Sequence, residues 1–157
     1  MTETLPPPQL EHVCDLAVTI APPVEVGQTA AGLRRMIPIA GGTVRGPRLN
    51  GKVLAGGADF QLILGAGTQA HLDARYVIEL DDGTRVFVQN TALRVASLEN
   101  SQRIMRGEPV NPAEIYFRSQ PRLEPEGDQW AWLGESQFIA SGRRAPDGVF
   151  LSFYRVC

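Results

Sequence analysis

The sequence predicts an all-β fold, a closed antiparallel up-and-down β-barrel of about eight to ten strands with little helix. Three observations support this prediction. Short runs of alternating apolar and polar residues recur along the chain, as in half-buried strands. Sixteen Gly and twelve Pro interrupt these runs, more than the usual combined share of about 12%, and disfavour long helices. Hairpin signals at residues 81–83 and 146–148 join consecutive runs, because Gly tolerates the positive φ of a tight turn.

The expected strands follow one another with short connections. Residues 10–20 alternate throughout, residues 70–80 form a second long run, and residues 59–64 are short and mostly apolar. Only residues 98–106 have a helical pattern, which Gly107 ends. We expect strands at residues 10–20, 33–40, 51–54, 59–64, 70–80, 84–90, 114–123, 137–141 and 149–156.

A β-sandwich and an up-and-down barrel both accommodate this many short strands. The consecutive hairpins favour the barrel, because closure of the sheet leaves no exposed edge strand. Residues 1–8 are polar and rich in Pro, so we expect a flexible N-terminal tail there. A single barrel domain is expected over residues 9–157, because the chain has the usual length of one domain.

The polar composition excludes several kinds of function. The formal net charge is −2, and the basic residues, all Arg except Lys52, are scattered, so we expect no nucleic-acid partner. No apolar run approaches the roughly 20 residues of a membrane-spanning helix, and the start of the chain has no signal-peptide pattern. We therefore expect a cytoplasmic protein with no membrane partner. Two His and two Cys cannot build a His-rich or four-Cys zinc site, so no metal or other cofactor is expected.

Polar residues occur inside the predicted strands. Asp59 and Gln61 share one face of their strand, and Asp73 and Arg75 share one face of theirs. Periodicity allows two arrangements: the polar faces meet water, as in any half-buried sheet, or they point into the barrel. Inside the barrel, an acid and an Arg must pair with each other or with a ligand, since Arg binds carboxylates through paired hydrogen bonds. An unpaired buried carboxyl would have a raised pKa and could act as a general acid or base.

Four motifs resemble those of a known family: Gly57-Ala58-Asp59-Phe60-Gln61, Asp73 with Tyr76, Tyr116-Phe117-Arg118, and Trp132-Leu133. From about residue 10 to residue 156, their order and spacing are similar to the family called domain of unknown function 3237, also uncharacterised protein family 0311. The resemblance implies a closed antiparallel barrel, often dimeric, with a pocket that carries the first motif. It favours the inward arrangement for Asp59 and Gln61. Phe60 stands where relatives usually have Trp, and Thr91 where Gly is expected, so an indole contact is lost and a local turn can differ.

The candidate catalytic residues are Asp59 and Asp73, because two carboxyls in different environments can divide the acid and base roles. The alternative is that each caps a turn or pairs with Arg as part of the structure. Arg75 and Arg118 could hold an anion or form ion pairs. Tyr116 and Trp132 could form an aromatic wall with polar tips or pack as ordinary core. The candidate ligand-binding residues are Gln61, Arg75, Tyr76, Tyr116, Arg118 and Trp132.

Three functions fit these residues. The first is a barrel that binds a small metabolite, anionic or carbonyl-bearing, in a polar pocket within the barrel. The second is a cofactor-free acid–base enzyme of the isomerase, cyclase or hydratase type, in which a carboxyl transfers the proton and Arg or Tyr stabilises the oxyanion. The third is a structural or interaction module with a filled barrel. The expected partners are a small-molecule ligand and, from the family resemblance, a second copy of the chain in a homodimer.

Overall fold

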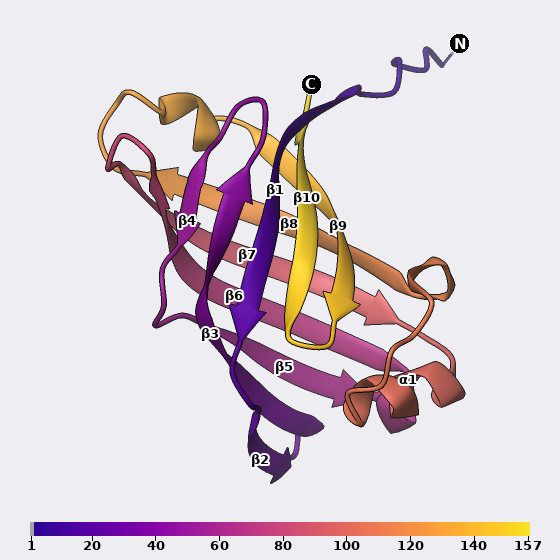
Figure 1. Ribbon diagram of the computed structural model, residues 1–157. Helices are drawn as coiled ribbons and strands as arrows, with labels where there is room; N and C mark the ends of the chain where they lie inside the picture. Colours follow the sequence, from indigo (N-terminus) through magenta and orange to yellow (C-terminus); the bar gives the residue numbers. More distant parts are fainter. Residues whose placement is uncertain (1) are drawn as a thin grey trace.

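Ten antiparallel strands form one continuous sheet in the computed structural model, which describes residues 2–157 (Figure 1). One α-helix, α1 (Leu98–Met105), and three short 3₁₀ helices, η1 (Gly65–Gly67), η2 (Pro112–Glu114) and η3 (Ala131–Leu133), lie in the connections. The strands are β1 (Leu10–Ile20), β2 (Val24–Gln28), β3 (Leu33–Arg45), β4 (Gly51–Val53), β5 (Ala58–Leu64), β6 (Gln69–Leu80), β7 (Arg85–Val95), β8 (Tyr116–Pro125), β9 (Gln137–Ala145) and β10 (Gly148–Val156).

The sheet closes into a barrel of eight strands, in the order β1, β10, β9, β8, β7, β6, β5 and β3. The ring is completed by pairing of β1 with β3, in which Leu16 lies opposite Val44. β4 bridges β3 and β6 beyond the end of β5, and β2 forms an outer hairpin on β3. The predicted all-β barrel is therefore confirmed, with β2 and β4 as two additional strands.

The helix and both hairpins form where the sequence predicts them. The Ser97 side chain accepts a hydrogen bond from the backbone N–H of Asn100 at the start of α1, and Gly107 follows the helix with a φ of 75°. Residues 2–9 are exposed and have no regular structure, and Met1 lies outside the described residues. No helix within residues 2–157 is both long and apolar enough to span a membrane.

Three strands, β3, β7 and β9, end four or five residues later than predicted, and the extensions of β7 and β9 matter for the site. β7 continues to Val95 instead of residue 90, and β9 continues to Ala145 instead of residue 141. In the extension of β7, buried Arg94 faces inward, while Leu93 and Val95 face outward and are exposed. The usual assignment of apolar residues to the core is reversed there, so the alternation no longer indicates which face is buried. The sequence analysis also missed the short strand β2.

The interior changes from apolar to polar along the barrel. On the inward face of β7 the residues are, in order, Val86, Val88, Asn90, Ala92 and Arg94. The first two belong to a filled apolar core, each at most 2% exposed, and burial of each such side chain contributes about 1.5–3 kcal/mol to stability. The last three line a cavity. One end of the barrel is therefore packed and the other is hollow.

Candidate functional site

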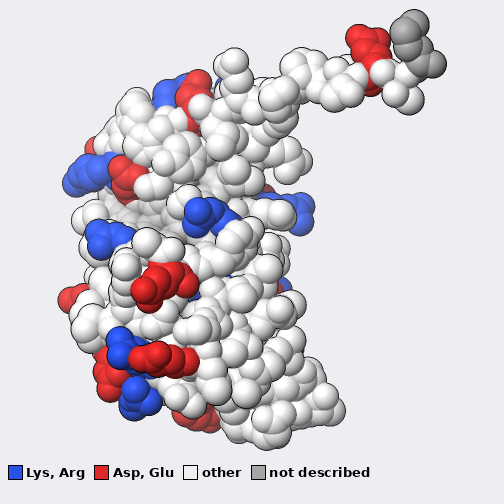
Figure 2. Space-filling model, turned by 90° about the vertical axis from the view of Figure 1, so that its right-hand side faces the viewer, with Lys and Arg blue, Asp and Glu red and all other residues white. Residues whose placement is uncertain are grey.

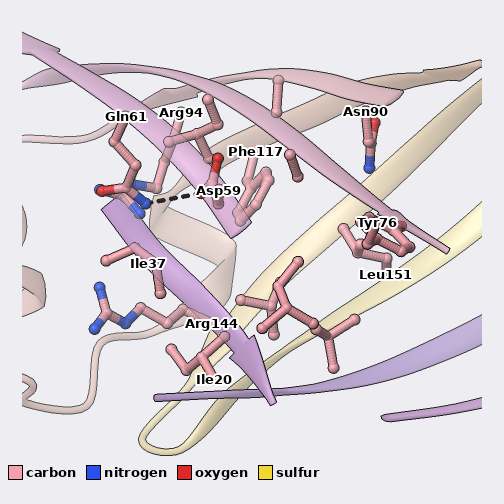
Figure 3. Close-up of a pocket in the computed structure, with 16 residues that line it drawn as sticks. Ile20, Ile37, Asp59, Gln61, Tyr76, Asn90, Arg94, Phe117, Arg144 and Leu151 are labelled. Atoms are coloured by element: carbon pink, nitrogen blue, oxygen red, sulfur yellow. Dashed lines mark hydrogen bonds between the residues drawn. The ribbon is translucent and has the colours of Figure 1, made fainter. Parts of the chain in front are cut away.

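A cavity of about 70 Å³ lies inside the hollow part of the barrel (Figure 3). Since one water molecule needs roughly 10–15 Å³ by such a measure, the cavity holds several waters or a small organic group. Most of its wall is apolar, including Ile20, Ile37, Ile39, Phe117 and Leu151. The polar residues that line it are Asp59, Gln61, Tyr76, Asn90, Arg94 and Arg144.

Asp59 places a carboxyl in this largely apolar wall. One carboxyl oxygen, Oδ2, accepts a hydrogen bond of 2.9 Å from Gln61 Nε2, and the other, Oδ1, accepts one of 3.1 Å from the backbone N–H of Asp73. Burial raises the pKa of Asp59, although the Gln61 hydrogen bond and the Arg94 charge act in the opposite direction. A carboxyl with a raised pKa is suited to donate and accept a proton nearer to neutral pH.

Two arginines, Arg94 on β7 and Arg144 on β9, bring positive charge to the same cavity. Arg94 is only 7% exposed. Burial, together with the nearby Arg144 and Arg35 charges, lowers its pKa to about 10, against the opposing effect of Asp59. Within residues 2–157 neither guanidinium lies within 4.0 Å of a carboxylate. One buried cation, Arg94, and one half-buried cation, Arg144, thus face the cavity with Asp59 as the nearby acid.

Arg35 adds a third positive charge beside this end of the barrel. It is 5% exposed, and its Nε lies 3.0 Å from Oε1 of Glu25, although without good hydrogen-bond geometry. Its Nη1 lies 2.9 Å from Sδ of Met105, the last residue of α1. Arg35 therefore links β3 to β2 and to α1, and a carboxylate offsets its charge, unlike the charges of Arg94 and Arg144.

Tyr76 and Asn90 form the polar part of the cavity next to the packed core. They are 3% and 4% exposed, and burial raises the pKa of the Tyr76 hydroxyl. Within residues 2–157 the Tyr76 hydroxyl and the Asn90 side-chain oxygen have no hydrogen-bond partner. In Figure 3 these two residues lie at one side of the cavity, and Gln61, Arg94 and Arg144 direct their nitrogens toward the other.

Of the eight residues predicted from the sequence, three line the cavity: Asp59, Gln61 and Tyr76. Periodicity left open whether the polar face of a strand points inward or outward, and the answer differs between β5 and β6. On β5 the polar residues point inward, whereas on β6 Tyr76 points inward and Asp73 and Arg75 lie on the outer surface. There Arg75 Nη2 lies 3.1 Å from Asp73 Oδ2, and Gln89 Nε2 donates a hydrogen bond of 3.3 Å to Asp73 Oδ1. Asp59 and Asp73 therefore do not face one cavity as a carboxyl pair.

The remaining predicted residues also lie outside the cavity. Tyr116 is 53% exposed on the outer face of β8, and the guanidinium carbon of Arg118 lies 5.6 Å from the centre of its ring. Trp132 lies in η3, where its ring packs at 6.2 Å from that of Phe138, and the guanidinium carbon of Arg48 lies 4.5 Å from the ring centre. The loop with η3 lies at the packed end, because its neighbour Leu133 belongs to the apolar core.

Sequence reasoning missed Asn90, Arg94 and Arg144 as cavity residues. The predicted strands ended at residue 90 and residue 141, so neither arginine was assigned to a strand face. A usable signal existed in the register: extending the strand at 84–90 by four residues places Arg94 on the same face as Val86 and Val88. No group of three or more His, Cys, Asp or Glu that could hold a metal occurs among residues 2–157.

The charged surface shows no dominant sign on the face drawn in Figure 2. Basic and acidic side chains are interspersed there among uncharged residues. Several exposed charges form pairs, such as Lys52 and Arg85 with Glu79. Exposed pairs of this kind contribute about 0–1 kcal/mol each, so the cavity, which contains the buried Arg94 with no carboxylate within 4.0 Å among residues 2–157, is the more informative feature.

Two comparisons with distant proteins concern an enzyme. The chain is 30% identical over 86 residues, which are 55% of this chain and 56% of the other, to "Hydroalkoxylation enzyme phnH" of Penicillium herquei. A crystal structure described as an enzyme from Penicillium herquei has a TM-score of 0.75 and 19% sequence identity, with both chains covered completely. At that identity the structure shows a shared fold.

The more similar relatives match almost the whole chain. A UPF0311 protein of Rhodopseudomonas palustris (strain TIE-1) is 39% identical over 156 residues, 99% of each chain. The crystal structure of the conserved protein of unknown function RPA1785 from Rhodopseudomonas palustris has a TM-score of 0.90 at 36% identity, and covers 98% of this chain and 100% of that one. A β-barrel-like protein from Acinetobacter baumannii AYE has a TM-score of 0.85 at 34% identity, with 99% and 100% covered. The family model "Protein of unknown function (DUF3237)" matches residues 8–156, and the chain therefore belongs to this family.

Proposed function

We propose that the barrel binds a small anionic organic molecule in its cavity. The observation that carries this proposal is the pair Arg94 and Arg144, which face the cavity and have no carboxylate partner within 4.0 Å in the described part of the chain, residues 2–157. A buried charge without a partner destabilises a protein by several kcal/mol. An anion such as a carboxylate would offset both charges, because guanidinium groups form short, charge-assisted hydrogen bonds with it.

The rest of the cavity fits the carbon skeleton of such a molecule. The apolar wall, with Ile37 and Phe117 among its residues, favours transfer of an apolar group from water by about 25 cal/mol per Å² buried. A mostly apolar cavity with a few polar groups is the usual form of a small-molecule site. The cavity in this half of the barrel argues against the alternative of a structural or interaction module with a filled barrel.

Binding of small carboxylates by isothermal titration calorimetry tests the proposal. Arg94→Met and Arg144→Met should each weaken binding by about tenfold or more, the effect of losing a hydrogen bond to a charged group of about 1.5–3 kcal/mol. Arg122→Met is the matched control, since Arg122 is exposed on the outer face of β8 and should bind as the wild type does. Equal binding by the wild type and both cavity variants would contradict the proposal.

A second candidate function is cofactor-free acid–base catalysis in the same cavity. The observation that favours it is the Asp59 carboxyl, whose pKa burial raises and which lies in a cavity with two cations. A distant relative is named a hydroalkoxylation enzyme, and addition of an alcohol O–H across a double bond requires proton transfer. Here Asp59 would transfer the proton, and Arg94 would stabilise developing negative charge.

Proton exchange distinguishes catalysis from binding alone. In heavy water an acid–base enzyme should incorporate deuterium next to the carbonyl of a bound oxo-carboxylate, observed by NMR, and Asp59→Asn should abolish incorporation while still binding the compound. Asp73→Asn is the matched control, because Asp73 lies on the outer surface and is paired with Arg75. Exchange that survives in Asp59→Asn would exclude Asp59 as the proton-transferring group.

The expected compartment and oligomeric state are further proposals. We propose a cytoplasmic homodimer, as the sequence analysis predicts. Cys14 and Cys157 are free, the first buried and the second exposed, which suits a reducing compartment.

For a dimer, the supporting feature is an apolar patch on the outside of the barrel, consisting of Phe60, Leu93, Val95, Leu98 and Tyr116, each at least 36% exposed.

A further inference from the structure

The part of the cavity next to the packed core carries two polar groups that no other residue among 2–157 satisfies. Tyr76 and Asn90 are 3% and 4% exposed, and both line the cavity. Within residues 2–157 the Tyr76 hydroxyl and the Asn90 oxygen have no hydrogen-bond partner. Buried polar groups are nearly always hydrogen-bonded in folded proteins, because an unsatisfied group opposes folding. Their partner therefore comes from outside the chain.

The strand register brings these two groups together and sets them apart from the arginines. Asn90 on β7 lies opposite Ala74 on β6, so Tyr76, two residues further along β6, is its diagonal neighbour on the same inward face. Arg94 lies four residues beyond Asn90 on that face, about 13 Å away along the strand. The cavity therefore has polar groups at two separate places (Figure 3).

Small side chains keep the space between the two places open. Ala74 and Ala92 line the cavity, and Ala92 lies opposite Leu72 on the neighbouring strand. A larger side chain at position 92 would extend into the space between Asn90 and Arg94. The apolar wall surrounds this middle part, so the region between the polar places suits a carbon skeleton.

We propose that Tyr76 and Asn90 form a second polar subsite that binds a hydroxyl group of the ligand. The ligand is then a hydroxy-anion: its anionic group lies at Arg94 and Arg144, its carbon skeleton lies between, and its hydroxyl lies at Tyr76 and Asn90. This inference rests on the proposed function and names the class of molecule. A hydroxyl fits better than a carbonyl because the Tyr76 hydroxyl can donate to it while the Asn90 oxygen accepts from it.

Matched pairs of carboxylates test the second subsite. The probes are hexanoate with its terminal-hydroxy derivative, and phenylpropionate with its para-hydroxy derivative, measured by calorimetry. The wild type should bind a hydroxylated member at least about tenfold more tightly than its partner, since a site built for a hydroxyl discriminates against analogues that lack it. Tyr76→Phe and Asn90→Leu should each remove most of this preference, measured as the ratio of the two affinities within each pair in the same variant. Tyr154→Phe is the control and should keep the preference, since Tyr154 does not line the cavity.

The possible outcomes separate this inference from the proposed function. Equal affinity for both members of each pair, or a preference that persists in Tyr76→Phe and Asn90→Leu, would overturn the second subsite while leaving anion binding intact. If no carboxylate of either pair binds, the proposed function fails, and the hydroxy-anion ligand fails with it. A measurement without ligand adds a check: Tyr76→Phe should leave the melting temperature unchanged or raise it. A fall of more than about 4 °C would show a partner for the hydroxyl in the free protein and overturn the inference.

Discussion

The environment of Asp59 makes it the most informative single residue. Its carboxyl accepts hydrogen bonds from Gln61 and from the backbone of Asp73, which favour the charged form, whereas burial favours the neutral form and has the larger effect on its pKa. The Gln61 side-chain oxygen is buried and has no hydrogen-bond partner among the described residues. After a flip of the amide, that oxygen could accept the proton of the neutral acid. Gln61 can thus form a hydrogen bond with Asp59 whether the carboxyl of Asp59 is charged or neutral.

The raised pKa of Asp59 predicts how stability changes with pH. Folding favours the protonated form, so its contribution is complete below the ordinary pKa of 3.8 and is lost as pH rises through the higher folded-state pKa. The free energy of unfolding of the wild type should therefore fall relative to that of Asp59→Asn as pH rises above about 4. Urea unfolding of both proteins at several pH values measures this difference.

The pKa of Asp82 is shifted in the opposite direction to that of Asp59, so its effect on stability has the opposite pH dependence. Hydrogen bonds from the backbone N–H of Thr84 and from Trp130 Nε1 lower the pKa of Asp82. The stability that the Asp82 carboxylate contributes is present above pH 3.8 and is lost as pH falls. The free energy of unfolding of the wild type should therefore rise relative to that of Asp82→Asn as pH rises.

For Asp59, a difference in the free energy of unfolding between wild type and Asp59→Asn that stays constant or grows with pH would show that Asp59 is not buried as described.

At the scale of single residues, the sequence predicted part of the site. Periodicity could not decide whether Asp59 and Gln61 face water or the interior, and the family motif favoured the correct inward arrangement. Alternation along the same strand places Tyr76 on the opposite face from Asp73 and Arg75, so these three candidates could not all face one cavity, and the structure turns Tyr76 inward. Facing direction depends on where each strand lies in the closed barrel, and a local pattern does not contain that information.

At the scale of elements, Gly57 determines how closely β5 approaches β6. A Cβ at Gly57 would lie 2.5 Å from the carbonyl oxygen of Arg75 and 2.6 Å from the Cβ of Tyr76. Both contacts are too short, so Gly57→Ala must push the strands apart next to the cavity. We expect a loss of about 1–3 kcal/mol in the free energy of unfolding, as for overpacked cores, together with weaker ligand binding because Tyr76 is displaced.

Gly134→Ala is the matched control for Gly57→Ala. Its added Cβ would meet no atom closer than 3.6 Å, and its φ of −82° is accessible to any residue. Urea denaturation of both variants should show a change within about 0.5 kcal/mol for Gly134→Ala, as for substitutions away from special features. Similar losses in the two variants would contradict a specific close approach at Gly57.

The accuracy of the predicted elements depended on whether their ends carry a local signal. α1 has a Ser97 cap at its start and Gly107 after its end, and it was predicted almost to the residue. β7 has no such signal at its end, and β9 was ended early, although the hairpin signal at 146–148 follows it directly, because the charged pair Arg143-Arg144 interrupts its apolar alternation. Both predicted strands therefore stopped before Arg94 and Arg144, and these two cations of the candidate site were missed.

At the scale of the whole molecule, the barrel has two unlike ends. At one end the loop with η3 contributes Leu133 to a filled core, and at the other Arg35 and α1 lie beside a cavity that contains charge. The hairpin signals were sufficient to predict the barrel, because consecutive antiparallel strands close most simply in that way. They could not predict the cavity, which depends on small residues such as Ala74 and Ala92 meeting across neighbouring strands.

The outer surface near α1 predicts self-association of the whole molecule. In the apolar patch defined above, Val95 on β7 lies opposite Tyr116 on β8, and Leu98 begins α1. Clusters of exposed apolar side chains mark protein–protein interfaces more often than single scattered ones. We therefore expect the wild type to be a dimer by size-exclusion chromatography with light scattering, and Leu93→Glu to be a monomer, because the charge would be buried without a partner in the interface.

Phe87→Glu separates this patch from a general effect of added surface charge. Phe87 is 42% exposed and lies on the same strand as Leu93, six residues and about 20 Å away, so this variant should remain a dimer. A monomeric wild type would exclude a stable dimer at the protein concentration used. A dimer that persists in Leu93→Glu would place the interface elsewhere on the barrel, while loss of the dimer in both variants would indicate a larger interface that covers most of the outer face of β7.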